Sequence, residues 1–283
     1  MIVTRFAPSP TGRLHLGHAL AAITAFDAAA RAGGQFLVRI EDIDISRARG
    51  AFESAIFDDL AWLGLRWPEP VLRQRDRFDA YRAVLDTLSG DGLLYPCFCR
   101  RSDIAAEIAR CAEAPHGPDG PLYPGTCKSL SVVEREERIG AGQAYALRLD
   151  SARTAARLPA LSFVEEGRSP NGETGEITVK PTLFGDVVLA RKEMPASYHL
   201  AVVVDDAFQD VSLVTRGNDL FAATHVQRTL QCLLGLPVPS YKHHRLILDD
   251  HGHKLSKREG ATTLGDLRRM GRTPQDIRAL LQL

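Results

Sequence analysis

The first forty residues constrain the fold most, because they contain in turn the patterns of a strand, a helix and a second strand. Residues 2–7 (IVTRFA) favour a short strand that ends at Pro8. An Ala-rich amphipathic stretch from about His15 to residue 33 predicts a helix, and the apolar run FLVRIED follows it. A strand, a helix and a strand in this span form a βαβ unit, so we expect a parallel sheet and an α/β fold.

The pattern changes in the middle of the chain and divides it into four stretches. Helices are expected over 46–65, 77–92 and 218–236, and strands at FGDVVLAR, HLAVVVDDA and VSLVTRG. Pro, Gly and Cys cluster between about 95 and 180, among short β-like pieces such as AYALRLD and EITVK. We therefore expect a first half of the sheet domain at 1–94, an insertion at 95–182, a second half at 183–250, and a polar loop with a short helical tail at 251–283.

Composition excludes several classes of protein. With 45% hydrophobic and 25% charged residues among 283, the chain is not mainly disordered. Lys+Arg 35 balances Asp+Glu 35, so any surface that binds nucleic acid must be local. No charge-free apolar run reaches about 18 residues, and the N-terminus has no apolar signal core, so we expect a cytoplasmic protein without a membrane span. Five cysteines in a chain this long do not suggest a disulfide scaffold.

The first motif with chemical content is PSPTGRLHLGH, at the start of the first expected helix. His15 and His18 are three residues apart, which places both imidazoles on one helical face. A helix N-terminus carries free N–H groups and a partial positive charge, so it suits phosphate. Gly17 lets a flat ring approach the backbone closely. Two surface histidines on an amphipathic helix are the alternative, and the motif alone favours neither.

The second motif is KLSKR at 254–258, in a polar loop between Gly252 and Gly260. Lys254 and Lys257 on such a loop can close over phosphates and stabilise the charge that develops in phosphoryl or nucleotidyl transfer. Alone, the pentapeptide is better interpreted as a solvated basic loop. Together with the two histidines, it indicates a two-sided site for ATP.

Three cysteines form a third group, because Cys97, Cys99 and Cys127 lie in one stretch. Three thiolates suit a tetrahedral metal, and a closed structural site requires a fourth ligand. His116 is the ordinary chemical choice for it. Thiols without a metal remain the alternative. The other two cysteines, at 111 and 232, are expected to act as small hydrophobic residues.

These motifs together resemble the class I aminoacyl-tRNA synthetases. HLGH stands at the HIGH position and KLSKR at the KMSKS position, with Leu for Ile, Leu for Met and Arg258 for the last Ser. RFAPSPTGRLHLGH and RIEDID are specifically like the glutamyl-tRNA synthetase branch, and the resemblance covers nearly the whole chain. It implies a Rossmann-like class I catalytic domain with Mg²⁺ accompanying ATP. It also implies that His15, His18 and Lys257 are catalytic and that Gly17 and Lys254 join them in binding ATP.

A second resemblance narrows the branch. The sequence stops at Leu283, soon after KLSKR, so we expect no helical anticodon-binding domain. With the CxC…YxxxC pattern, this is similar to the glutamyl-queuosine tRNA(Asp) synthetases, which activate glutamate with ATP and attach it to the queuosine base of tRNA(Asp). The resemblance favours Tyr123 over His116 as the fourth ligand of one structural zinc. ATP, L-glutamate and queuosine-containing tRNA(Asp) are the expected partners, and we expect a monomer.

A glutamate site needs one anion for the ammonium and one or two guanidinium groups for the carboxylates. Arg5, Glu41 and Arg216 end predicted strands, where open parallel sheets bind ligands. The resemblance implies that Glu41 takes the ammonium and Arg216 the side-chain carboxylate. An arginine there favours glutamate over glutamine, because an amide leaves its charge unpaired. The implied set comprises Arg5, Ala7, Ser9, Glu41, Tyr198 and Arg216. Structural salt bridges are the alternative.

The remaining charged residues carry weaker hypotheses. Asp42 and Asp44 are expected to be turn and helix-cap residues, and Asp205-Asp206 stay unassigned. Arg100-Arg101 and the stretch 242–245 are candidate RNA contacts. Two rival functions remain open: a short enzyme that charges the 3′ end of tRNA(Glu), and a non-catalytic amino-acid-sensing paralogue, in which the ATP motifs would be expected to decay.

Overall fold

The predicted βαβ unit at the N-terminus is confirmed in the computed structural model, which describes residues 1–110, 115–248 and 262–283. Strand β1 (Val3–Phe6) leads into helix α1 (Leu16–Arg31), and β2 (Gln35–Ile40) pairs with β1 in parallel. Helix α1 ends where Gly33 adopts a φ of +59°, a left-handed conformation that favours glycine. The two strands therefore end at the same edge of the sheet.

The main sheet consists of two parts that lie side by side. Their strand orders are β3-β2-β1 and β11-β12-β8-β9. The remaining bounds are β3 (Leu72–Arg73), β11 (Leu213–Gly217), β12 (Ser240–His244), β8 (Ser162–Glu165) and β9 (Gly175–Thr178). The two halves meet between β1 and β11, where the N–H of Ser212 donates to the carbonyl oxygen of Val3 over 3.0 Å. All ladder pairs on either side of this junction are parallel except β8–β9.

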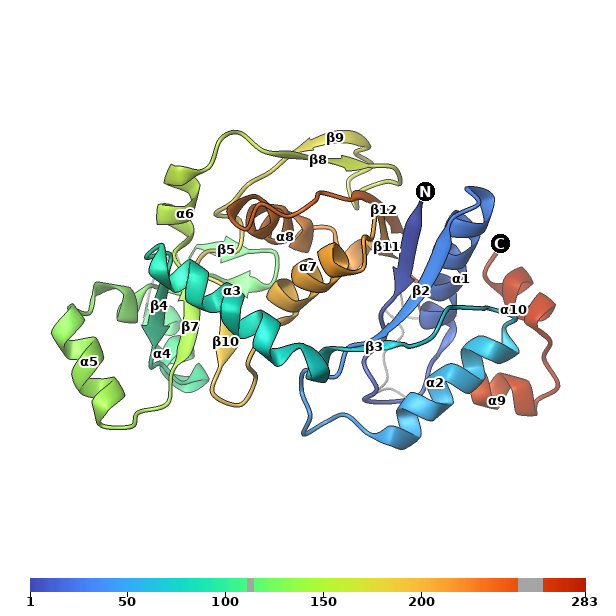
Figure 1. The fold of residues 1–283 in the computed structure, drawn as a ribbon, viewed down its shortest axis with the longest axis horizontal. Helices are drawn as coiled ribbons and strands as arrows, with labels where there is room; N and C mark the ends of the chain where they lie inside the picture. Colours follow the sequence, from blue (N-terminus) through green and yellow to red (C-terminus); the bar gives the residue numbers. More distant parts are fainter. Residues whose placement is uncertain (111–114, 249–261) are drawn as a thin grey trace.

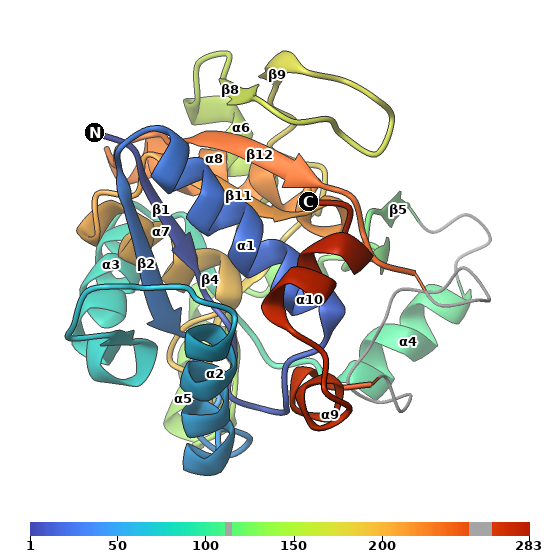
Figure 2. The same ribbon diagram turned by 90° about the vertical axis from the view of Figure 1, so that its right-hand side faces the viewer.

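Helices cover both faces of this sheet (Figure 2). Helix α1 covers the face turned toward the viewer, next to α10 (Pro274–Leu280), while α7 (Tyr198–Phe208) and α8 (Ala223–Leu233) lie behind the sheet. Apolar side chains of α1, β2, α2 (Gly50–Trp62), α9 (Leu264–Arg269) and α10 form one core cluster. No helix of the described residues has both the length and the apolarity that crossing a bilayer requires.

A second, antiparallel sheet lies beside the first, on the left of Figure 1, in the order β10-β7-β4. Its strands are β10 (Val188–Arg191), β7 (Ala146–Leu149) and β4 (Leu94–Cys97). Around it lie α3 (Phe78–Gly90), α4 (Arg101–Arg110), α5 (Val132–Gly140), α6 (Ser151–Arg157) and the short hairpin β5 (His116–Gly117) and β6 (Gly120–Pro121). Single 3₁₀ turns occupy Gln74–Arg77, Thr126–Ser129 and Asn218–Leu220.

Strand pairing crosses the boundary that we proposed at residue 182 in both directions. Strands β8 and β9 precede this boundary, yet β8 pairs with β12 of the parallel sheet. Strand β10 follows it, yet pairs with β7 of the second sheet. Apolar alternation identifies a strand, but the partner of the strand depends on contacts between distant segments.

The predicted strand at HLAVVVDDA is wrong, because residues 198–208 form helix α7. Its β-branched run suggested a strand, but a short apolar run does not distinguish a buried strand from a buried helix. Ser197 precedes the run as the N-cap, and its side chain accepts a hydrogen bond from the N–H of Leu200 over 3.5 Å. Val202 and Val203 are buried in the core between α3, α7 and α8.

The helix predicted over 46–65 begins four residues later than expected, which changes the role of Asp44. Helix α2 starts at Gly50 after Arg49, whose side chain makes no capping hydrogen bond. Asp44 instead stabilises a turn, in which its carboxylate accepts from the hydroxyl of Ser46 over 2.5 Å. The expectation of a turn is confirmed for Asp44, and the expectation of a helix cap is wrong. Asp42 is buried and accepts from the N–H of Arg75 over 2.9 Å.

Candidate active site and metal centre

One cavity of about 470 Å³ opens at the carboxyl ends of β1, β2 and β11. It collects most of the residues that the sequence analysis selected. Those that line it are Arg5, Ala7, His15, Gly17, His18, Glu41, Tyr198 and Arg216. Ser9 is half-buried in the segment after β1 and does not line the cavity. Lys254 and Lys257 lie outside the described residues.

The two histidines meet at the N-terminus of α1, although His15 precedes the helix rather than lying on its face. His15 is the N-cap, and its Nδ1 accepts from the N–H of Gly17 over 3.1 Å. The Nδ1 of His18 accepts from the N–H of His15 over 3.2 Å, and the ring centroids are 3.9 Å apart. Because each Nδ1 accepts, the Nε2 of each neutral ring carries the proton. Both imidazoles are thereby fixed as N–H donors at Nε2.

Gly17 is needed at this helix start for a reason visible in the structure. A Cβ there would lie 3.0 Å from the Cε1 of His15. The flat ring that approaches the backbone is therefore the ring of His15 itself.

The chain returns to this helix start directly after the KLSKR segment. The N–H of Leu264 donates to the carbonyl oxygen of Leu14 over 2.8 Å, and His15 and Thr263 form an isolated antiparallel bridge. Thr263 is also the N-cap of α9, in a capping box with Asp266. Backbone contacts thus tie Thr263 and Leu264 to the start of the HLGH motif.

Beneath the cavity, two arginines share one buried carboxylate. Asp206 of α7 accepts from the Nε of Arg5 over 2.9 Å and from the Nη1 of Arg39 over 2.7 Å. Burial alone would raise the pKa of Asp206, but the positive charges of Arg5 and Arg39 outweigh it and lower that pKa. Asp206, which the sequence left unassigned, therefore positions Arg5. Asp205 points elsewhere, and it accepts from the hydroxyl of Tyr81 over 2.7 Å.

Glu41 stands above this cluster at the end of β2. Its Oε1 lies 3.5 Å from the Nη2 of Arg39, and the carboxylate lines the cavity. Burial raises the pKa of Glu41, and the charges of Arg39 and Arg5 oppose that rise only in part. A second cation placed in the cavity would stabilise the ionised form of this carboxylate.

Arg216 is buried and is held by neutral groups. Its Nη2 donates to the hydroxyl of Thr224 over 2.6 Å, and its Nη1 donates to the Oε1 of Gln227 over 2.7 Å and to the hydroxyl of Tyr198 over 3.5 Å. Its Nε donates to the Nε2 of His243 over 2.9 Å. Within the part of the chain that the structure describes, no carboxylate forms an ion pair with Arg216. A buried guanidinium without an anion, facing a cavity, is suited to bind a carboxylate.

The His243 ring links Arg216 to a distant carboxylate. The Nδ1 of His243 lies 2.5 Å from the Oε2 of Glu165 on β8. Since the Nε2 of His243 accepts from Arg216, its proton is on Nδ1 and is donated to Glu165. Burial lowers the pKa of His243, and Arg216 lowers it further against the effect of Glu165. The ring is therefore neutral, and it orients Arg216 without cancelling its charge.

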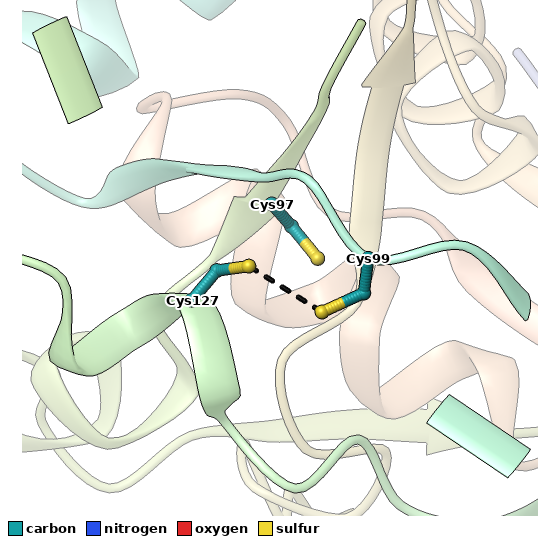
Figure 3. A group of neighbouring side chains, drawn as sticks. All are labelled: Cys97, Cys99 and Cys127. Carbon is teal, nitrogen blue, oxygen red and sulfur yellow. Dashed lines mark hydrogen bonds between the residues drawn. The ribbon is translucent and has the colours of Figure 1, made fainter. Parts of the chain in front are cut away.

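The candidate metal-binding residues meet at the end of β4. The sulfur atoms of Cys97, Cys99 and Cys127 all lie within 4.8 Å of one another and point toward a common centre (Figure 3). The sulfurs of Cys99 and Cys127 are 3.4 Å apart. Bonds of about 2.3 Å in a tetrahedron place sulfurs about 3.8 Å apart, so this donor set fits a metal such as zinc.

Tyr123 joins the three cysteines, whereas His116 does not. The hydroxyl of Tyr123 lies 3.5 Å from the sulfur of Cys99 and accepts from the N–H of Cys127 over 2.8 Å. His116 is exposed on the β5–β6 hairpin and is not part of the cluster. Burial alone would raise the pKa of the Cys97 thiol, but hydrogen bonding to Tyr123 and the nearby Arg148 guanidinium lower it. The hydroxyl of Tyr123 therefore lies where a fourth ligand would be expected, beside the cysteine sulfurs.

The other residues selected from the sequence occupy varied positions. Arg100, which follows Cys99, and Arg101, the first residue of α4, are both exposed. Arg245 lines the catalytic cavity, and its Nη2 donates to the carbonyl oxygen of Leu281. Cys232 packs against the core as expected, and Cys111 lies outside the described residues. Sequence reasoning missed Arg39, whose only signal was a charged residue inside the apolar run FLVRIED.

The fold and the paired-histidine cavity are those of a class I tRNA synthetase. The family model described as "tRNA synthetases class I (E and Q), catalytic domain" matches residues 1–283. A glutamate tRNA ligase from Elizabethkingia meningosepticum superposes with a TM-score of 0.74 at 26% identity, over 92% of this chain and 52% of that chain. The predicted α/β class I fold is therefore confirmed.

Sequence relatives narrow the family further. "Glutamyl-Q tRNA(Asp) synthetase" from Rhodobacter capsulatus is 51% identical over 285 residues, which cover the whole of both chains. The protein of the same name from Nocardia farcinica is 43% identical, over 98% of this chain and 82% of that relative. The chain belongs to the glutamyl-Q tRNA(Asp) synthetase family, and it is a ligase of class I.

Proposed function

We propose that this protein activates L-glutamate with ATP and transfers the glutamyl group to the queuosine base of tRNA(Asp). The observation that supports the proposal is the cavity, which is lined by His15 and His18 together with the buried residue Arg216. Such a cavity supports binding of a triphosphate and a carboxylate together. The full-length identity of 51% to a glutamyl-Q tRNA(Asp) synthetase supports the choice of substrates.

Glutamate binding follows from the charges that line the cavity. Arg216 binds the side-chain carboxylate with the hydroxyl of Tyr198 beside it, and Glu41 binds the ammonium. Arg5, held in place by Asp206, lies next to Glu41 and completes the set of charges. Glutamine leaves Arg216 without an anion, which is the basis for rejecting it. Ala7, on the segment after β1, provides a contact from the wall of the cavity, whereas Ser9, two residues further along, does not line it.

ATP binds at the N-terminus of α1. The N–H groups of the first turn and the Nε2 protons of His15 and His18 stabilise negative charge on the phosphates. Gly17 keeps the first turn free of a side chain that would displace the His15 ring. Lys254 and Lys257 supply further positive charge from the segment outside the described residues. Mg²⁺ accompanies ATP and neutralises charge on its phosphates.

The proposed reaction has two steps, activation of glutamate and transfer of the glutamyl group. An oxygen of the α-carboxylate of glutamate attacks the α-phosphorus of ATP, and the bond to the β-phosphate breaks to give glutamyl-adenylate and pyrophosphate. A hydroxyl of the queuosine cyclopentene ring then attacks the carbonyl carbon of the adenylate. AMP leaves, the ester forms, and the hydroxyl proton is lost to solvent.

We propose one structural zinc, held by Cys97, Cys99, Cys127 and Tyr123. Three sulfurs and a phenol oxygen complete a closed four-ligand site, which stabilises a fold rather than binding substrate. Cys97 ends β4 and Cys99 stands two residues further on, whereas Tyr123 and Cys127 lie on either side of Gly125, so the metal joins two separate segments.

The decisive experiment compares two acceptors. Purified enzyme is incubated with ATP, labelled glutamate and tRNA(Asp) that either contains queuosine or lacks it, and the labelled nucleotide is located by nuclease mapping. We expect label on the queuosine nucleotide and none on the unmodified transcript. Label on the 3′-terminal adenosine would instead favour a short enzyme that charges tRNA at its 3′ end. Absence of glutamate-dependent pyrophosphate exchange would favour a non-catalytic paralogue.

A further inference from the structure

A second cavity lies on the three-stranded sheet, away from the residues of the proposed catalytic site. It has a volume of about 370 Å³ and lies between the segment 139–147 and the end of β10. Two of its lining side chains are unusually exposed for their size, with Ile139 at 42% and Tyr145 at 37%. Helix α5, which supplies Ile139, has no buried residue at all.

The register of the sheet places this cavity at the metal-binding end. Cys97 of β4 pairs with Ala146 of β7, and Ala146 pairs with Arg191 of β10. One position further along the three segments stand Phe98, Tyr145 and Lys192. The rings of Phe98 and Tyr145 are 5.7 Å apart, and the N–H of Phe98 donates to the sulfur of Cys127 over 3.3 Å.

The metal cluster therefore supports the wall of the cavity. Phe98 lies in the sequence between Cys97 and Cys99, and its buried ring packs with the cysteines. The same ring contacts the ring of Tyr145 and supports it. A half-exposed aromatic ring on a rigid support provides a flat surface for stacking at little cost in conformational entropy.

The charged side chains that line this cavity are all positive. Arg191 and Lys192 line it, both are exposed, and no carboxylate lines it. Among the residues that the structure describes, neither cation forms an ion pair. Arg138 adds a third positive charge, with its guanidinium 5.5 Å from the centroid of the Phe98 ring. Glu193 follows in the β10 hairpin but does not line the cavity.

We propose that this cavity binds a nucleotide of a single-stranded RNA loop, whose base stacks on Tyr145 and whose phosphate is bound by Arg191 and Lys192. An aromatic ring flanked by cations is the combination that binds splayed loop nucleotides without strict sequence preference. Since the net charge of the chain is +0, a local group of unpaired cations is what RNA binding requires here.

The proposal rests on the proposed function, because it assigns the cavity to the same tRNA. Lys192 and Tyr198 are six residues apart, so their Cα atoms are at most about 22 Å from one another. A loop nucleotide bound at Tyr145 therefore lies within the span of one RNA loop from the catalytic cavity that Tyr198 lines, so another nucleotide of the same loop can reach that cavity.

The test measures binding of a fluorescent queuosine-containing anticodon stem-loop of tRNA(Asp) by anisotropy. Tyr145→Ala should weaken binding roughly 5- to 100-fold, and Tyr145→Phe, which keeps the ring, should stay within about 2-fold of the original protein. Lys192→Glu should weaken binding and flatten its dependence on salt concentration. The matched control is Arg31→Glu, which makes the same charge change at an exposed position at the C-terminus of α1, the opposite end of that helix from the catalytic cavity.

Kinetics separate this inference from the proposed function. For labelled-glutamate transfer, the variants should raise the KM for tRNA and leave kcat unchanged. Glutamate-dependent pyrophosphate exchange at saturating tRNA should also be unchanged.

If the original protein transfers glutamate to queuosine while Tyr145→Ala and Lys192→Glu bind RNA as tightly as the original protein, the inference is wrong and the proposed function stands. If it does not transfer glutamate to queuosine, the function is wrong, and the binding series still decides whether the cavity binds RNA. Should Tyr145→Ala unfold, Lys192→Glu decides the matter, because the Lys192 side chain is exposed and makes no hydrogen bond or ion pair with any other described residue.

Discussion

At Arg216, a buried positive charge is kept available for a ligand by the choice of its neighbours. Thr224, Gln227 and Tyr198 are neutral, and His243 is fixed as the tautomer that accepts from the guanidinium. Glu165, the nearest anion along this chain of hydrogen bonds, contacts the far ring nitrogen and the backbone N–H of His243 but forms no ion pair with Arg216. These neighbours orient the guanidinium of Arg216 without neutralising its charge. The charge is therefore available to pair with a carboxylate of the substrate.

Arg216→Ala should therefore remove most glutamate activation. The lost interaction is a charge pair in a buried site, so the loss in transition-state stabilisation should be on the order of 2–5 kcal/mol. Glutamate-dependent pyrophosphate exchange measures it, and ATP binding should survive because the N-terminus of α1 is unchanged. Tyr198→Phe is the matched control, since it removes one hydrogen bond of 3.5 Å and leaves the charge in place. Exchange close to the original rate in Arg216→Ala would refute the assignment.

Single residues could be selected from the sequence where a strand end or a motif marked them. Arg5, Glu41 and Arg216 each follow an apolar run, and their gathering in one cavity follows from parallel strands. The groups that hold them could not be selected, because Arg39 pairs with a carboxylate 167 residues away and His243 with one 78 residues away. Pairings across such separations depend on the tertiary fold, which local patterns do not encode.

For helices and strands, the type of an element was easier to predict from the sequence than the strand with which it pairs. The βαβ unit, α3, α8 and the strands β7, β9 and β11 follow from periodicity and turn residues. Helix α7 was mistaken for a strand because its valines face a core on several sides. The pairing of β10 with β7, and of β8 with β12, required knowledge of which distant segments meet.

The stability of the antiparallel sheet β10-β7-β4 should depend on the zinc that we propose. Purified protein should contain about one zinc per chain, and Cys97→Ser should lose it and lower the thermal unfolding midpoint, because metal-binding free energy contributes to folding. Cys232→Ser is the matched control, since Cys232 packs against the core far from the cluster and its substitution should keep the metal.

The fourth ligand can be tested in the same assay. Tyr123→Phe should weaken metal retention against a chelator, whereas His116→Ala should not, because His116 is outside the cluster. Full metal content in Cys97→Ser, or none in freshly prepared protein that has never met a chelator, would contradict the zinc site.

For the whole molecule, buried and half-buried histidines contribute to the response to acid. Burial lowers the pKa values of His199, His225, His243 and His244 below the ordinary 6.5. Below pH 6.5 the unfolded chain therefore binds more protons at these rings than the folded protein, so they reduce the free energy of unfolding as the pH falls. Asp59 acts in the opposite sense, because burial raises its pKa to about 6 and the folded state binds its proton first.

His199 isolates one part of this response. Its ring lies between Phe184 and Tyr198, and burial followed by the charge of Arg216 lowers its pKa to about 4. A shift from 6.5 to about 4 corresponds to at most about 3 kcal/mol of unfolding free energy lost on acidification. Urea unfolding of the original protein and of His199→Gln, measured from pH 7 to pH 4, should give curves that converge or cross as the pH falls, since only the original protein carries this proton linkage. Parallel curves across that range would mean that His199 is protonated as readily in the folded protein as in the unfolded chain.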